Sequence, residues 1–323
     1  MGRGSGPEAV WDAAPACATA PPSCWRPRGI RSGLPAERSG YDTGTSTSSF
    51  LERLQTAART NDSWLCVGLD PDPSLLPTGV SLEPFLAGIL EATADLVCCY
   101  KPNVAFFEAL GPAGERALRT LREAIPSSTP VLIDAKRGDT PQTMRAYARA
   151  LFDDLQADAV TVNAYLGGDS LEPFLERGDR GVFVLCKTSN PGAGEIQDLV
   201  VDGHTPEPLF LRVARLATAW ARQATLGLVV GATYPADVAA VRGIAPTAPI
   251  LLPGVGAQAG DLERSVQAGM DASGGGAIVN ASRSILYASR AADWQTAARN
   301  EAERLRAAIN TARVQPASAT SPH

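Results

Sequence analysis

Eight short apolar runs, alternating with longer segments of helical periodicity, constrain the fold of this chain most. The runs span residues 64–70, 95–103, 130–136, 158–165, 181–189, 226–234, 248–256 and 276–283. Helical spacing of apolar residues lies between them at 83–96, 115–125 and 208–225, and a further helix is predicted at 49–61. Near-continuous apolar strands that alternate with helices are typical of parallel sheets covered on both faces. Eight such units predict an α/β fold, a single-domain (β/α)8 TIM barrel.

An open, doubly wound sheet is the alternative to the barrel. Such a sheet usually carries a glycine-rich turn after its first strand. The first run here ends in GLDPDP, which offers no such turn. We therefore assign residues 47–312 to the barrel domain.

The two ends of the chain differ from this pattern. Residues 1–46 are rich in Gly, Pro, Ala and Arg and show no apolar periodicity, which predicts a disordered extension. Two alternatives stay open for this segment: sequence upstream of the true start codon, or a transit peptide. Residues 313–323 are interpreted as a disordered tail.

Composition excludes several functional classes. The net charge of −5 gives no electrostatic footprint for nucleic acid, and no stretch approaches the about 20 apolar residues of a membrane span. Six cysteines without a C-x-x-C pair indicate a reduced, cytoplasmic protein, and Cys186 is interpreted as a core residue. The only histidines, His204 and His323, leave little room for a histidine-based triad or zinc site.

The segment VLIDAKRGDT (131–140) places charges at the end of a predicted strand. Asp134 and Lys136 are two residues apart and should share a face, with Lys101 of the preceding strand beside them. Gly138 permits a sharp turn before Asp139. This spacing predicts a Lys–Asp–Lys–Asp cluster at the barrel mouth that keeps Lys136 protonated as a proton donor. A purely structural salt-bridge network is the alternative.

Two further segments follow strands on the other side of the predicted barrel. LLPGVGAQAGD (251–261) and NASRSI (280–285) come after the last two strands, where barrels often bind phosphate. Gly254 and Gly256 let backbone amides approach an anion, and Gln258 and Arg283 supply donors. A plain turn is the alternative. In CKTSNPGAGEIQDL (186–199), Ser189 is exposed by a turn and could contact a polar heterocycle, unless the loop has no special purpose.

These motifs together resemble a known enzyme family. The segments VGLDP, KPNVAFFE, DAKRGD, TVNAYLGGDSLEPF, KTSNPGAGEIQDL, PGVGAQ and NASRSILYAS are similar to those of orotidine 5′-phosphate decarboxylases, in the bacterial (type 2) subgroup that carries DAKRGD. The resemblance covers about residues 50–310. It implies conversion of orotidine 5′-monophosphate to UMP and CO₂ in pyrimidine biosynthesis, without a cofactor or metal, by a homodimer with shared active sites.

The resemblance also implies roles for individual residues. Lys136 would protonate C6 of the pyrimidine, and Asp134 would lie against the departing carboxylate and complete the charge array with Lys101. Asp139 would reach into the neighbouring subunit's site. The implied substrate-binding residues are Asp70 for the ribose, Ser189 for the base, Gln258 and Arg283 for the phosphate, and also Thr143, Pro253 and Gly256.

Two alternatives and two departures accompany this hypothesis. A magnesium-dependent 3-keto-hexulose-phosphate decarboxylase or synthase, or a barrel that binds nucleotide phosphate without turnover, would share part of the pattern. The glycine-rich segment AGMDASGGGAIVN (268–280) could shift Arg283, and NAYLGG has Ala164 where the subgroup would have proline.

Overall fold

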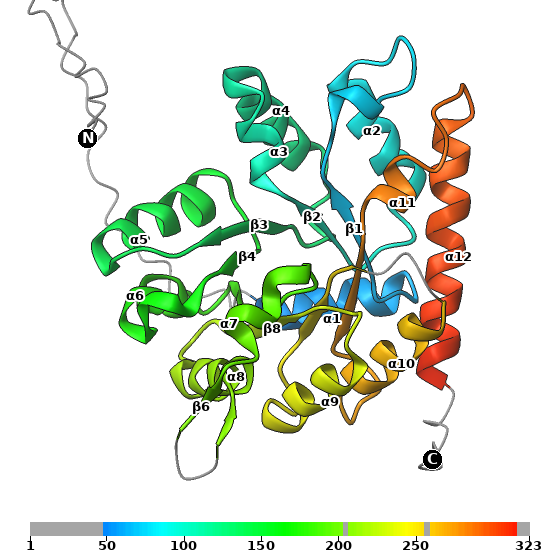
Figure 1. The fold of residues 1–323 in the computed structure, drawn as a ribbon. Helices are drawn as coiled ribbons and strands as arrows, with labels where there is room; N and C mark the ends of the chain where they lie inside the picture. The colour runs from blue at the N-terminus through cyan, green and yellow to red at the C-terminus, as the bar shows by residue number, and fades with distance from the viewer. Residues whose placement is uncertain (1–47, 203–205, 255–258, 315–323) are drawn as a thin grey trace, which may run out of the picture. The chain divides into compact units, whose positions relative to one another are not determined.

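The computed structural model describes residues 48–202, 206–254 and 259–314, and within them a closed parallel barrel (Figure 1). Its strands run in the order β2-β1-β10-β9-β8-β5-β4-β3. Backbone bridges Tyr100–Val131 and Asn103–Asp134 join β2 to β3 and close the sheet. The strands are β1 (Leu65–Leu69), β2 (Cys99–Pro102), β3 (Leu132–Arg137), β4 (Ala159–Val162), β5 (Gly181–Lys187), β8 (Thr225–Val230), β9 (Ile250–Leu252) and β10 (Ala277–Ala281). Each overlaps one predicted run, so the predicted (β/α)8 barrel is confirmed.

Helices cover the outside of the strands. They are α1 (Phe50–Thr60), α2 (Leu82–Thr93), α3 (Val104–Glu108), α4 (Gly111–Ala124), α5 (Pro141–Ala148), α6 (Gly168–Leu175), α7 (Gly194–Gln197), α8 (Leu209–Trp220), α9 (Pro235–Ile244), α10 (Ala259–Gly269), α11 (Arg283–Leu286) and α12 (Trp294–Val314). The other described elements are the short 3-10 helices η1 (Pro73–Leu75), η3 (Ala164–Leu166) and η4 (Pro191–Ala193), the π-helix η2 (Arg149–Asp154), and the antiparallel pair β6 (Val200–Val201) and β7 (Glu207–Pro208). The predicted extension, residues 1–46, lies outside the described residues. At the other end, α12 includes residues 313 and 314 of the predicted tail, and residues 315–323 lie outside the described residues.

Polar residues at the strand ends start several of these helices. The Asn103 side chain accepts a hydrogen bond from the Ala105 amide and begins α3, and the Asn163 side chain does the same for Tyr165 at η3. Asparagine is favoured at such positions because its oxygen satisfies an amide that the helix leaves unpaired. Part of the polarity at the strand ends is therefore helix capping.

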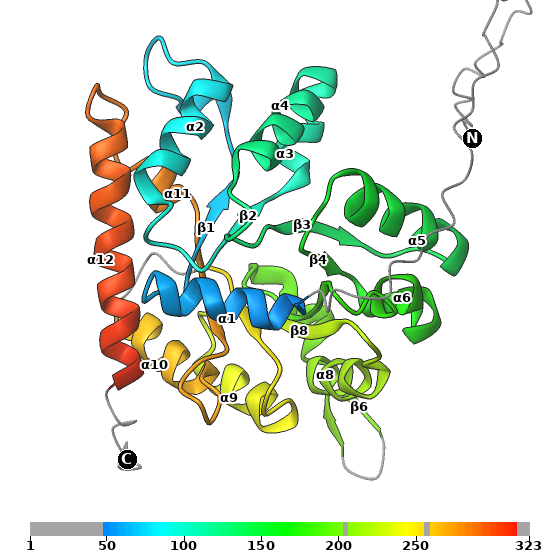
Figure 2. The same ribbon diagram turned by 180° about the vertical axis from the view of Figure 1, so that it is seen from behind.

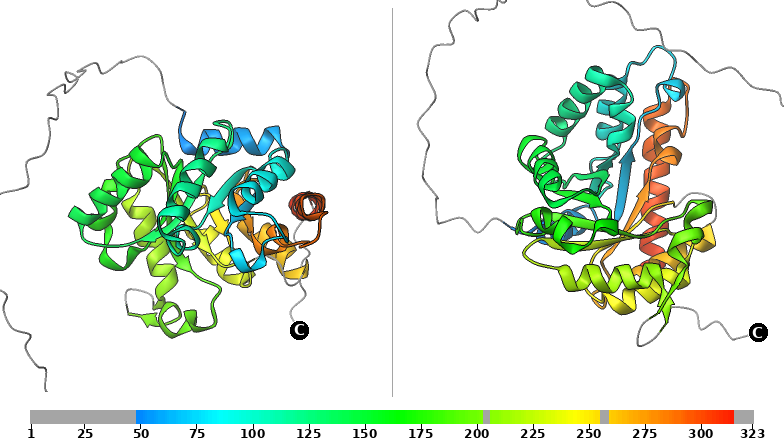
Figure 3. Two further views of the ribbon diagram at one scale, coloured as in Figure 1. Left: turned by 90° about the horizontal axis from the view of Figure 1, so that it is seen from above. Right: turned by 60° about the vertical axis from the view of Figure 1, so that its left-hand side comes forward.

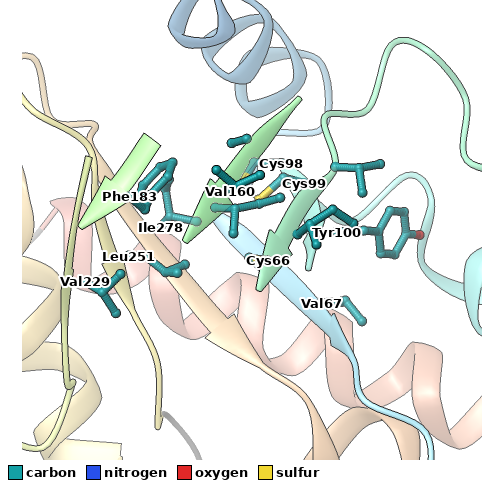
Figure 4. Close-up of a cluster of buried hydrophobic side chains, with 14 of the residues drawn as sticks. Cys66, Val67, Cys98, Cys99, Tyr100, Val160, Phe183, Val229, Leu251 and Ile278 are labelled. Atoms are coloured by element: carbon teal, nitrogen blue, oxygen red, sulfur yellow. Dashed lines mark hydrogen bonds between the residues drawn. The ribbon is translucent and has the colours of Figure 1, made fainter. Parts of the chain in front are cut away.

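The barrel interior is filled by side chains from most of its strands (Figure 4). Cys66, Phe183, Leu251 and Ile278 are all buried there. All four cysteines of the described ranges, which also include Cys98, Cys99 and Cys186, are buried and free. Burial raises the pKa of Cys186 to about 12, so its thiol stays protonated. The interpretation of Cys186 as a core residue is confirmed.

Helix α1 lies across the amino-terminal ends of the strands (Figure 2). The Phe50 ring packs edge-to-face on Phe183 of β5 at a centroid distance of 5.8 Å. A Cβ on Gly181 would lie 2.6 Å from the Phe50 ring, so only glycine fits there. Arg53 donates to Asp158 and to the Asp179 carbonyl at 3.0 Å each, just before β4 and β5. One end of the barrel is therefore closed, and only the other is open for chemistry.

Helix α12 packs between α2 and α10 and is seen end-on in the left view of Figure 3. The Trp294 ring fills the space over Gly88 of α2, where a Cβ would lie 2.3 Å from the indole. Among the helices of the described ranges, none has the length and hydropathy to cross a membrane.

Truncation of Phe50 should destabilise the barrel without altering its chemistry. Phe50→Ala removes a fully buried ring and leaves a cavity, so the free energy of unfolding should fall by about 3–5 kcal/mol. Thr60→Ala, at an exposed position of the same helix, is the matched control and should change it by less than about 0.5 kcal/mol. Urea unfolding measures both; equal losses would show that α1 does not seal the barrel as described.

Candidate active site

Three charged side chains meet at the carboxyl ends of β2 and β3. The Asp134 carboxylate accepts a hydrogen bond from Lys101 Nζ at 3.0 Å through Oδ2 and one from Lys136 Nζ at 2.6 Å through Oδ1. The Thr161 hydroxyl of β4 donates to the same Oδ1 at 2.8 Å. Lys101 and Asp134 are buried, whereas the Lys136 side chain is 47% exposed. A lysine that opens to the barrel mouth is thus held by a buried carboxylate.

The backbone reaches this arrangement through an irregularity rather than through regular strand alternation. Ile133 pairs with Val160 and Arg137 pairs with Val162, so β3 bulges between these two positions. Lys136 lies within the bulge at φ +48°, in the left-handed region that non-glycine residues rarely adopt. Its amide donates to the Thr161 hydroxyl at 2.9 Å. Strained backbone of this kind is typical of functional sites, where the surrounding structure holds it.

Thr161 was missed by the sequence analysis. Its hydroxyl accepts from the Lys136 amide and donates to Asp134, so it fixes both residues. A signal existed: Thr161 is two residues before Asn163 and therefore on the same face of the strand.

The protonation states of the buried pair follow from their surroundings. Burial by itself would raise the pKa of Asp134, but Lys101, Lys136 and the Thr161 hydrogen bond outweigh it and lower the pKa to about 2. Burial by itself would lower the pKa of Lys101, but Asp134 and then Asp70 raise it above its usual value. Both groups are therefore charged at neutral pH.

Asp70 follows β1 directly and faces the same cluster. Register places Gly68 beside Lys101, which brings the next residues of β1 to the mouth. Asp70 Oδ1 is buried and has no hydrogen-bond partner within the described part of the chain. A buried carboxylate oxygen needs a donor, so this atom is suited to a ligand hydroxyl or a water.

Asp139 and Thr143 lie apart from the three-charge cluster. The Asp139 carboxylate accepts from the Thr140 amide at 2.6 Å, and the Thr143 hydroxyl lies 3.5 Å from the Thr140 hydroxyl. Across residues 48–202, 206–254 and 259–314, Asp139 makes no ion pair within 4.0 Å. Within one chain, the structure therefore brings together three of the four predicted charges.

The predicted phosphate segment is only partly described. Pro253 and Gly254 follow β9, and Gly254 has φ +89°, which suits glycine. Arg283 begins α11 and is exposed, whereas Gly256 and Gln258 lie outside the described residues. The glycine-rich segment forms a turn before β10, where Asp271 accepts from the amides of Ser273 and Gly275. That turn is at the opposite end of β10 from Arg283.

Ser189 is exposed two residues beyond β5 and approaches two glycines. A Cβ on Gly231 would lie 3.0 Å from Ser189 Cβ, and one on Gly254 would lie 3.2 Å from Ser189 Oγ. The turns after β5, β8 and β9 therefore meet at Ser189. In the described ranges, no group of three or more His, Cys, Asp or Glu side chains is arranged to hold a metal ion.

Replacing Asp134 by asparagine should remove a pH-dependent part of the stability. Because the folded-state pKa is depressed, this contribution is present above the unfolded-state pKa near 4 and is lost as the pH falls towards about 2. Asp134→Asn should lower the free energy of unfolding by at least about 2 kcal/mol at pH 7, and the gap should narrow between pH 4 and 2. Urea unfolding at each pH measures it; a gap independent of pH would contradict the assignment.

Comparisons with known proteins identify the family of this chain. A family model described as "Orotidine 5'-phosphate decarboxylase / HUMPS family" matches residues 63–299. Orotidine 5'-phosphate decarboxylases of Thermomicrobium roseum and Roseiflexus castenholzii are 53% and 52% identical to this chain, over 83% and 82% of it and 98% of each relative.

Solved structures show the same likeness. The OMP decarboxylase of Leishmania donovani has a TM-score of 0.72 at 39% identity, with 83% of this chain and 100% of that chain covered. The UMP synthase of the same organism has a TM-score of 0.72 at 42% identity, with 81% of this chain and 57% of that chain covered. The matched region includes every strand of the barrel and all three residues of the charge cluster, and the chain belongs to the orotidine 5′-phosphate decarboxylase / HUMPS family.

Proposed function

We propose that this chain converts orotidine 5′-monophosphate to UMP and CO₂, with Lys136 as the proton donor to C6. The observation that carries the proposal is the ion-paired Lys101–Asp134–Lys136 cluster at the open end of the barrel. The names of the curated relatives support the substrate. The DAKRGD segment supports membership in the bacterial subgroup with this motif.

The chemistry follows from the charges at the cluster. When the bond between C6 and the carboxylate breaks, its electron pair stays on C6 and CO₂ leaves. The Lys136 ammonium is attracted to this developing negative charge and then transfers a proton to C6, which gives UMP and a neutral amine. Asp134 holds Lys136 in place beforehand and puts a negative charge beside the carboxylate that leaves. Solvent returns the proton to Lys136, because its side chain is half exposed.

The remaining predicted residues would bind the nucleotide. Asp70, whose Oδ1 has no partner in the described structure, would accept from a ribose hydroxyl. Ser189 would contact the base, and Arg283 would bind phosphate with Gln258, Pro253 and Gly256. Binding of the phosphate, away from the reacting carbon, supplies energy that the chemical step can use.

A homodimer would complete the site. Within the described residues, the hydrogen bonds of the Asp139 and Thr143 side chains go to Thr140 and not to the charge cluster, which leaves them available to a partner's site. Large apolar side chains are exposed nearby, on α3 and η3 after β2 and β4: Phe106 at 37%, Tyr165 at 88% and Leu166 at 43%. Such exposure is typical of a contact surface.

Loss of Lys136 should abolish turnover but not folding. Lys136→Ala should lower kcat by about 10²–10⁴-fold, since the proton donor is gone. The fall in pyrimidine absorbance of orotidine 5′-monophosphate measures this. Arg119→Ala, on the exposed face of α4, is the matched control and should turn over normally. Near-normal activity of Lys136→Ala would refute the role of Lys136, and wild-type activity abolished by EDTA would favour a metal-dependent reaction.

Mixing two inactive variants should restore activity if sites are shared. In a heterodimer of Lys136→Ala with Asp139→Asn, one site carries both defects and the other carries neither. Random reassortment of subunits should therefore regenerate about one quarter of the wild-type activity. Each variant mixed with itself is the control; a mixture that stays inactive although subunits exchange would contradict the shared site.

A further inference from the structure

Lys187 is a buried lysine at the barrel mouth that the proposed chemistry does not use. It ends β5, and a register shift between Leu185 and Lys187 changes the direction of the strand there. Its side chain is 3% exposed, and Nζ is ion-paired with Asp198 Oδ1. The rings of Phe210 and Tyr234 each lie 5.3 Å from the ammonium. This charge is thus enclosed by aromatic walls and compensated by a carboxylate eleven residues later in the chain.

A second contact lies beside this ion pair. The Thr188 amide donates to Gln197 Oε1 at 2.8 Å, and Gln197 Nε2 donates to the Thr188 hydroxyl at 2.9 Å. Residues 187–188 are therefore joined to 197–198 by three polar contacts. The segment between them, residues 189–196, is closed into a short loop that we call the clamped loop. Fixing both ends of a short loop removes most of its conformational freedom.

The clamped loop begins with Ser189. Ser189 packs closely against Gly231 and Gly254, where an added Cβ would lie 3.0 Å from Ser189 Cβ and 3.2 Å from Ser189 Oγ respectively. On its inner side, it is the first residue after the Lys187–Thr188 anchor. Among the described residues the Ser189 side chain makes no hydrogen bond, so its position there depends on the clamp and on this packing.

We propose that Lys187, Asp198 and Gln197 are positioning residues that hold Ser189 in place for the nucleobase. This inference rests on the proposed function, in which Ser189 contacts the base. It makes a specific distinction between ligands. Loosening the clamp should weaken the binding of ligands that carry the base, whereas ligands with only ribose and phosphate should bind as before.

The geometry indicates which variant tests the clamp most cleanly. Asp198→Asn would leave a buried ammonium without its partner, which is costly for folding. Asp237 of α9 is a second acidic group that interacts with this ammonium, but burial raises the pKa of Asp237, and Lys187 opposes that rise. Asp237 would therefore compensate the charge of Lys187 only in part. Lys187→Met keeps an apolar stem between the aromatic rings, and Asp198, whose side chain is 51% exposed, can then be hydrated. Gln197→Ala removes the second contact without changing any charge.

The experiment compares two ligands on the full-length protein by titration calorimetry. For Lys187→Met, the Kd of UMP should rise about tenfold, as expected for the loss of about one well-placed hydrogen bond, and Gln197→Ala should show a smaller rise. The Kd of ribose 5-phosphate should stay within about twofold in both. KM for orotidine 5′-monophosphate should rise with the UMP Kd, with a smaller change in kcat. Asp202→Asn is the control, because Asp202 is an exposed carboxylate four residues after Asp198 and outside the clamp.

Three other results would overturn the inference. Unchanged UMP affinity in both variants would show that the clamp does not position Ser189. An equal loss of UMP and ribose 5-phosphate affinity would assign the clamp to phosphate binding or to general stability. Failure of the wild-type protein to bind UMP more tightly than ribose 5-phosphate would overturn the proposed function as well. Because Gln197→Ala leaves all charges in place, it decides the question even if Lys187→Met does not fold.

Discussion

The site depends on one buried carboxylate between two ammonium groups. Asp134 contacts both Lys101 and Lys136, one with each of its carboxylate oxygens. Lys101 and Lys136 both lower the pKa of Asp134, and Asp134 in turn raises the pKa of Lys101, so the buried pair is charged. The arrangement therefore holds the Lys136 side chain at the barrel mouth by an ion pair with a buried carboxylate. Three features position this carboxylate: the strand order, the bulge in β3 and the hydrogen bond from the Thr161 hydroxyl.

The two ends of the barrel have separate physical roles. At the closed end, α1 packs Phe50 against Phe183 and anchors Arg53 before β4 and β5. At the open end, polar side chains lie close together and some remain without partners in the described structure, among them Asp70. Good packing at one end can stabilise strain at the other, such as the left-handed backbone of Lys136. Stability and chemistry are thereby located in different layers of the same strands.

The sequence predicted the barrel well because eight apolar runs alternating with helices have few other solutions. It also predicted that Lys101, Asp134 and Lys136 would meet, since their strands are adjacent and their side chains are long. It did not predict how they meet: regular alternation was expected, whereas β3 bulges and Lys136 has positive φ. Bulges arise from tertiary contacts, here with Thr161, and leave no local signal. Roles that depend on a partner chain or a ligand, such as that of Asp139, stay predictions for the same reason.

The buried thiols have a consequence for the route of protons. Cys66 and Cys99 are register partners in the barrel layer beneath Gly68 and Lys101, and burial raises the pKa of Cys66 well above its usual value. Both thiols are fully buried beneath the charge cluster, whereas the Lys136 side chain is 47% exposed at the mouth. In the proposed reaction, each proton given to the ring must consequently be replaced from the mouth, by the same opening through which product departs. Reprotonation of Lys136 and release of the nucleotide then both take place through the open end of the barrel, one after the other.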